Sequence, residues 1–213
     1  MSIARRVGLA GFAGGLGLIA SATPGAAMEF TYHPPLILAV GHIKNGDENT
    51  FKRLLASIPK GEVKGVVLHS GGGFVHAAGE IGREIREKGL TTVVDASSVS
   101  CVSACTILFA AGTQRVYLNA GGVKDGATAD ARKGLGFHEG SSSTSRDPNH
   151  YSGAGTAQVI AFFYEFGVSG AAALATKAPP ESVYMVSGPT ALQIGLATRL
   201  GDTGGSAKKK GRP

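Results

Sequence analysis

Short apolar runs that alternate with segments of helical periodicity are the feature that most constrains the fold of this chain. The apolar runs at 36–40 and 65–68 and the β-branched run at 91–94 have the length and composition of buried strands. Apolar residues recur at helical spacing in the segments between them, at 51–58 and 77–85. Parallel strands need such crossover helices, so the pattern predicts an α/β domain whose mainly parallel sheet is covered on both sides.

Further segments extend this pattern toward the C-terminus. Small apolar residues over 101–111 predict a buried helix, and the runs at 157–166 and 190–196 predict two more. Asp47 is a good N-cap and is expected to begin the first helix. Residues 120–156 are rich in Gly, Ser and Asp with little periodicity, which predicts a long surface segment.

Composition excludes several classes of protein. The 213 residues suffice for one globular domain, and a hydrophobic share of 43% with 17% charged residues excludes a disordered chain. Two cysteines are too few for a disulfide scaffold or a four-cysteine zinc site. The 33 glycines show no three-residue period and indicate tight turns and close backbone approaches.

The two ends of the chain differ in composition from its body. Residues 1–27 place Arg5 and its neighbouring arginine before an apolar run and then small residues, the order of a secretory signal peptide cleaved after Ala27. An uncleaved membrane anchor is the alternative. Residues 204–213 form a basic flexible tail, and 28–203 remain as the α/β domain. We therefore expect a periplasmic or secreted protein in an oxidising compartment.

The net charge of +6 does not indicate a nucleic-acid partner. Two of the positive charges lie within 1–27 and four lie within 208–213, which leaves the body between them neutral. A folded nucleic-acid-binding domain carries its basic stripe on the domain itself. We expect no nucleic acid among the partners.

Three short segments have the composition of catalytic elements. The turn Ser70-Gly71-Gly72-Gly73 follows a predicted strand, so its main-chain N–H groups can converge on a negative atom. Ser103 lies among small residues that leave its hydroxyl accessible. His138 can accept a proton from a hydroxyl and return it to a leaving group. The plainer alternatives are a tight strand-to-helix turn, a helix N-cap and a packed or solvated histidine.

Taken together, these segments resemble the proteolytic subunit of the Clp protease, within the ClpP/crotonase superfamily. The resemblance runs from about residue 36 to 200 and includes the closing segment Ser187-Gly-Pro-Thr-Ala-Leu-Gln-Ile-Gly-Leu. It implies a ClpP/crotonase-like α/β fold with a mainly parallel sheet, repeated ββα units and flanking helices. It also implies a serine peptidase that forms homo-oligomers and acts on a peptide or protein, with Ser103 as nucleophile and His138 as base. In that arrangement the N–H groups of Gly73 and Ala104 form the oxyanion hole.

The sequence departs from the family pattern at the third catalytic position. The residue expected to be an orienting aspartate is Val183, and we take Glu181 as the candidate acid, with Asp147 and Asp202 as alternatives. The gap of 35 residues between nucleophile and base is longer than in the Clp subunit, which suggests a surface insertion at 124–133. An inactive ClpP-like binding or assembly module is therefore the alternative function.

Cys101 and Cys105 flank the candidate nucleophile at a spacing of four residues. In an exported protein they are expected either to form a local disulfide or to remain two small buried thiols. No third ligand accompanies them, so we expect no metal site, and the sequence indicates no cofactor. Export also argues against an ATPase partner.

Overall fold

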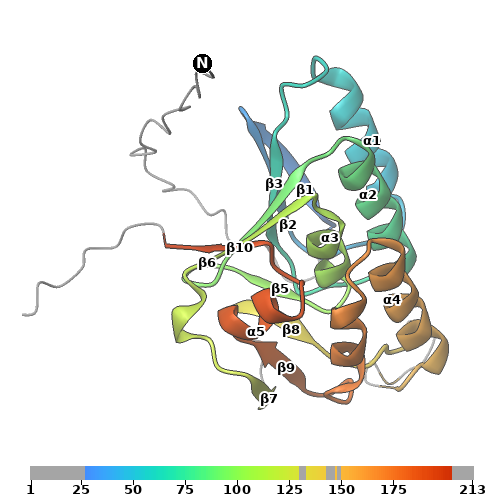
Figure 1. Ribbon diagram of the computed structural model, residues 1–213. Helices are drawn as coiled ribbons and strands as arrows, with labels where there is room; N and C mark the ends of the chain where they lie inside the picture. The colour runs from blue at the N-terminus through green and yellow to red at the C-terminus, as the bar shows by residue number, and fades with distance from the viewer. Residues whose placement is uncertain (1–26, 130–132, 143–146, 148–149, 203–213) are drawn as a thin grey trace, which may run out of the picture.

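The computed structural model describes residues 27–129, 133–142, 147 and 150–202 (Figure 1). The expected signal peptide, apart from Ala27, and the expected basic tail lie outside these described residues. Within the described ranges, no helix combines the length and the apolar character needed to cross a bilayer.

The larger sheet has six strands and is parallel except at one edge. Its order is β1-β2-β3-β4-β6-β10, and only β1 runs antiparallel to its neighbour. The mainly parallel sheet predicted from the apolar runs is confirmed. The strands are β1 (Glu29–His33), β2 (Leu36–Val40), β3 (Gly65–His69), β4 (Thr91–Asp95), β6 (Gln114–Leu118) and β10 (Arg199–Gly201).

The helices of the described residues cover only one face of this sheet, and this part of the chain does not have the helices expected on both sides. Figure 1 shows the helices gathered on one side, and α2 packs against α1, α3 and α4. Every second residue of β2 and β4 is buried and the others are partly exposed, as expected for a sheet with a single packed face. The helices are α1 (Asp47–Ser57), α2 (Val75–Glu87), α3 (Cys105–Ala111) and α4 (Gly153–Glu165).

A second sheet of four strands contains part of the segment that we predicted to be a surface excursion. Its order is β5-β8-β9-β7, and all four residues of β8 are buried because β8 lies between β5 and β9. Pairing with β8 also holds residues 100–102 as a strand, so the helix expected from Cys101 begins only at Cys105. The strands are β5 (Ser100–Val102), β7 (Gly126–Thr128), β8 (Gly134–Phe137) and β9 (Val183–Val186); α5 (Gly188–Gln193) and the 3-10 helices η1 (Ala120–Gly122) and η2 (Ser169–Thr176) complete the described elements.

The two sheets are joined through the hydroxyl of Tyr117. This side chain extends from β6 and is fully buried. Its oxygen accepts a hydrogen bond from Leu135 N at 3.1 Å and donates one to the Val186 carbonyl at 3.1 Å, so it contacts β8 and β9 together. Burial raises the pKa of Tyr117 to about 12, and the hydroxyl therefore keeps its proton at neutral pH.

We expect Tyr117→Phe to destabilise the protein by about 1–3 kcal/mol, because the Leu135 N–H and the Val186 carbonyl lose a buried partner. Urea unfolding measures this loss. Tyr164→Phe is the matched control, since Tyr164 is 63% exposed and should change stability by no more than about 0.5 kcal/mol. Equal stability of the two variants would show that the hydroxyl does not join the sheets.

Candidate active site

The glycine-rich turn is hydrogen-bonded to the strand that leads to Ser103. Ser70 N donates to the Ser100 carbonyl at 2.9 Å, and Val102 N donates to the Ser70 carbonyl at 3.0 Å. The buried Ser70 hydroxyl accepts from Gly72 N at 3.0 Å, which folds the turn back on itself. These bonds place the end of β3 beside the end of β5, so the turn and Ser103 are neighbours.

Two glycines of this turn occupy positions that a side chain cannot. Gly72 has φ +102°, and a Cβ there would lie 2.7 Å from the Cβ of Ser103. Gly73 has φ +140°, and a Cβ there would collide with the carbonyl oxygen of Ile43. By contrast, a Cβ on Gly71 would meet nothing within 4 Å. The turn thus approaches Ser103 closely at Gly72 and the Ile43 backbone closely at Gly73, and both approaches need a residue without a side chain.

Ser103 adopts a left-handed backbone conformation, with φ 56°. A non-glycine residue in this region is strained and is held there by its surroundings. The Ser103 N–H donates to the Gly136 carbonyl at 2.9 Å, and its own carbonyl accepts from Thr106 N and Thr106 Oγ1 at 2.9 and 2.6 Å. Its hydroxyl makes no hydrogen bond to another described residue, and Ala104 is the residue at the N-cap of α3. Ser103 is therefore not a capping residue.

Two main-chain N–H groups beside Ser103 have no acceptor among the described residues. They belong to Gly73 and Ala104, the pair expected from the sequence to form an oxyanion hole. The Ala104 nitrogen would lie 3.2 Å from a Cβ on Gly72, so the two backbone segments are in contact. Free donors of this kind can bind an oxygen that becomes negative in a transition state.

His138 directly follows β8 and makes one hydrogen bond within the described part of the chain. Its ring Nδ1 lies 2.6 Å from the main-chain oxygen of Glu139. A carbonyl oxygen only accepts, so Nδ1 is assigned as the donor and Nε2 retains a lone pair. This is the tautomer that a general base needs.

The structure does not bring Glu181 to His138. The pairing of Phe137 with Tyr184 places Val183 next in register to His138, and Val183 is buried and apolar. Glu181 precedes β9 in an exposed turn and makes no hydrogen bond to the imidazole. The alternatives Asp147 and Asp202 are also exposed and do not bond to the ring.

Ser103 and His138 line one small pocket of about 40 Å³, together with Gly73. They do not hydrogen-bond to each other, a common state of catalytic groups without substrate. The walls combine polar and apolar groups, and none of the described lining residues is a lysine. Besides Ser103, His138 and Gly73, the residues that line this pocket are Val75, Thr106, Phe137, Gly140, Ser141, Val159 and Ala175.

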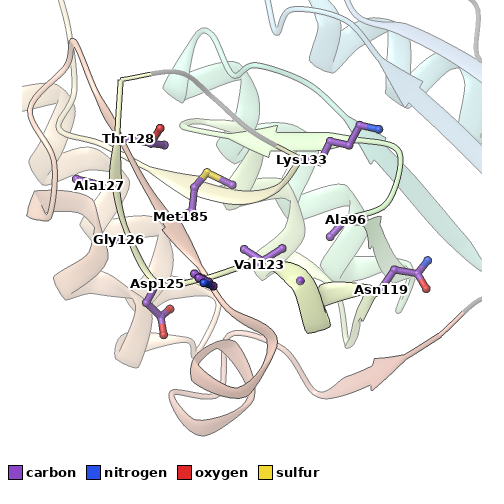
Figure 2. A pocket seen from close by; sticks show the side chains of 11 residues that line it. Ala96, Asn119, Val123, Asp125, Gly126, Ala127, Thr128, Lys133 and Met185 are labelled. Atoms are coloured by element: carbon purple, nitrogen blue, oxygen red, sulfur yellow. The ribbon is translucent and has the colours of Figure 1, made fainter. Parts of the chain in front are cut away.

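A larger hollow of about 760 Å³ lies elsewhere, beside β7 and η1 (Figure 2). Its described lining includes Lys133 and Met185 but no serine, cysteine or histidine. Asp125, at its rim, accepts hydrogen bonds from the Ser187 and Thr190 hydroxyls at 2.9 and 2.6 Å. Burial alone would raise the pKa of Asp125, but these bonds outweigh it and lower the pKa. The carboxylate thus anchors α5, and the candidate nucleophile Ser103 lines the smaller pocket instead.

A disulfide joins Cys101 to Cys105, with 5.2 Å between their Cα atoms. Both residues are fully buried, and Ser103 lies midway between them in the sequence. The sequence left open a disulfide or two buried thiols, and the structure contains the disulfide. Over the described ranges, no group of three His, Cys, Asp or Glu residues is placed to hold a metal ion.

The fold is shared with known structures, although no family model and no curated protein sequence matches the chain. A serine-to-alanine variant of a membrane-bound stomatin-specific protease superposes with a TM-score of 0.50 at 15% identity, over 76% of each chain. A lysine-to-alanine variant of that protease, in complex with a substrate peptide, gives 0.51 at 15% identity over 76% of this chain and 72% of that one. DspI of Pseudomonas aeruginosa superposes with a TM-score of 0.47 at 13% identity, over 88% of this chain and 72% of that one.

These similarities concern the fold. The first two structures have the ClpP/crotonase-like α/β fold, and the chain described here has the same fold. The expected fold class is thereby confirmed. Function has to be argued from the site itself.

The glycine turn can be tested with a matched pair of variants. We expect Gly73→Ala to destabilise the protein by about 1–3 kcal/mol, because the new methyl group meets a backbone carbonyl and φ is positive. Gly71→Ala should stay within about 0.5 kcal/mol of the original, since its methyl group has open space. Thermal or urea unfolding of both variants measures the difference, and two equally stable variants would contradict the close approach at Gly73.

The disulfide should contribute to stability through the small loop that it closes. Replacing Cys101 and Cys105 together by serine is expected to cost about 2 kcal/mol on the chain-entropy model for a loop of this size. The original protein unfolded with and without a thiol reductant should show the same loss. An unchanged urea midpoint in both experiments would mean that the bond adds no stability.

Proposed function

We propose that this protein is an exported serine hydrolase, most simply a peptidase, in which Ser103 is the nucleophile and His138 is the general base. One observation carries the proposal. A serine hydroxyl and two nearby main-chain N–H groups have no hydrogen-bond partner among the described residues, and the hydroxyl shares one pocket with an imidazole in the base tautomer. Helix capping or core packing does not require this combination.

The reaction follows from these positions. Ser103 Oγ attacks the substrate carbonyl carbon while its proton moves to His138 Nε2, and the oxyanion accepts hydrogen bonds from the N–H groups of Gly73 and Ala104. The carbon–nitrogen bond then breaks, and His138 gives its proton to the leaving amine. Water, deprotonated by the same imidazole, attacks the acyl ester, releases the carboxylic acid and restores the Ser103 hydroxyl.

The main-chain carbonyl of Glu139 takes the place of the missing orienting acid. It accepts the Nδ1 proton of His138 and so fixes the tautomer and the ring orientation. A neutral carbonyl offers less stabilisation to the imidazolium than a carboxylate does. The rate should therefore fall below that of a full triad while the same chemistry is retained.

Export, substrate and assembly belong to the same proposal. Residues 1–27 run from basic to apolar to small residues, and this order supports export. A protease of similar fold was obtained in complex with a substrate peptide, which supports a peptide or protein substrate. The helix-free face of the larger sheet carries partly exposed apolar side chains, including Leu38, Val67 and Val93, which supports a homo-oligomer. We propose no nucleic acid, ATPase or cofactor as a partner.

A binding or assembly module without catalysis is the second candidate. The observation that favours it is that no carboxylate of the described residues bonds to His138, together with the unformed bond between this ring and Ser103. Reactivity of the serine separates the two candidates.

An active-site serine probe such as a fluorophosphonate should label the exported protein. We expect Ser103→Ala to abolish the labelling and His138→Ala to slow it by about 100-fold or more, the usual contribution of a general base. Mass spectrometry of the labelled peptide identifies the modified residue. Labelling that survives in Ser103→Ala, or no labelling of the original protein, would favour the binding module.

Glu181→Gln tests the assignment of the orienting group. Its carboxylate is exposed and makes no hydrogen bond to the imidazole, so the variant should be labelled at the original rate. A loss comparable to that of His138→Ala would instead restore Glu181 as the third catalytic residue.

A further inference from the structure

A buried carboxylate outside the catalytic pocket has a partner whose chemistry depends on processing of the chain. Asp47, at the start of α1, is only 6% exposed. The sequence predicted that Asp47 caps this helix, but the residue at the N-cap is Gly46 and Asp47 makes no capping hydrogen bond. Its Oδ2 instead accepts hydrogen bonds from Lys44 N at 2.7 Å and from Met28 N at 3.2 Å.

No ion pair compensates this carboxylate within the described part of the chain. The salt bridges found there join other residues, on α1, α2 and α4. The positive end of the α1 dipole supplies part of the missing charge. Burying a carboxylate without a cationic partner is still costly, so an added positive charge at this position should be stabilising.

The Met28 nitrogen is the atom at which such a charge can arise. In the unprocessed chain it is an amide N–H, linked to the exposed residue Ala27. The sequence predicts cleavage of that same bond. Cleavage leaves the nitrogen where it is and converts it into the α-amino group of the mature chain.

We propose that the Asp47 carboxylate binds the α-ammonium group of Met28. This group forms when the chain is cleaved after Ala27. This inference rests on the export that we propose above but not on the catalytic assignment. A peptidase specific for small residues hydrolyses the bond between the Ala27 carbonyl carbon and the Met28 nitrogen. Water supplies the oxygen of the new Ala27 carboxylate, and the released amine takes up a proton at neutral pH.

Cleavage after Ala27 would then strengthen the attachment of β1 to α1. Within the described residues, β1 is an edge strand that pairs only with β2, and its Phe30 ring packs on Phe51 of α1 with centroids 5.1 Å apart. An ammonium–carboxylate bond at Met28 adds a charge-assisted contact just before this strand begins. The mature protein should therefore hold β1 more firmly than the precursor does.

The test uses the mature protein recovered from an exporting bacterial host. Its intact mass should correspond to a chain that starts at Met28. The α-amine is then acetylated selectively at mildly acidic pH, which removes the charge and leaves an amide N–H as in the precursor. We expect acetylation to raise the unfolding equilibrium constant in urea by about tenfold, because a charged hydrogen bond is replaced by a neutral one.

Two variants show whether Asp47 causes the effect. In Asp47→Asn, acetylation should change the unfolding constant by no more than about twofold, since the carboxylate is gone. Glu48→Gln is the matched control, because Glu48 is a partly exposed acid at the same helix end that does not bond to Met28, and the tenfold effect should persist there. If Asp47→Asn does not fold, the comparison of acetylated and free original protein decides alone.

A mature chain that begins elsewhere, or an acetylation effect that is absent or equal in Asp47→Asn, would overturn the inference. Serine-probe labelling distinguishes this failure from failure of the catalytic proposal. Labelling at Ser103 with no effect of acetylation refutes the Asp47 site alone, and the reverse result refutes catalysis alone.

Discussion

The hydrogen bonds between Ser70 and β5 are the interaction on which the rest of the site depends. They join the end of a strand in the larger sheet to a strand in the smaller one, so they bring the glycine turn to Ser103. The Ser70 side chain is committed to its own turn and is unavailable for chemistry. A buried polar group that is satisfied locally thus fixes the backbone that surrounds a free hydroxyl.

The conformation of Ser103 is held from several directions. Its carbonyl is bonded to Thr106, its N–H is bonded to β8, and the disulfide spans the residues on both sides. These restraints maintain a positive φ that a serine would otherwise avoid. The hydroxyl can then project beside the free N–H groups of Gly73 and Ala104 instead of capping α3.

His138, the proposed base, is held by a backbone carbonyl and by no acidic side chain of the described residues. His138 leaves β8 at the point where the strand ends, and the carbonyl of the next residue holds its Nδ1. Such an arrangement survives substitution of any acidic side chain nearby, because a carbonyl is present whatever residue follows. The same arrangement explains how Val183 can occupy the position where the family pattern has an aspartate.

Much of the fold could be predicted because it depends on local patterns. The segments predicted to be strands from their composition form β2, β3 and β4, and the segments with helical spacing form α1 and α2. Where pairing between distant segments decides the structure, local patterns failed. β8 is composed of Gly, Leu, Gly and Phe, and it is a strand because β5 and β9 supply partners on both sides.

For the site, the sequence by itself determined which residue types were present: a serine among small residues, a glycine turn and a histidine at a defined spacing. Only the tertiary structure decided which of their atoms are free, since that depends on hydrogen bonds between segments far apart in the chain. It left the Ser103 hydroxyl without a hydrogen bond to any described residue, turned the Asp47 carboxylate toward Met28 and formed no hydrogen bond between Glu181 and the imidazole. Composition and spacing report neither strand register nor side-chain direction, and these two properties decide which groups can react.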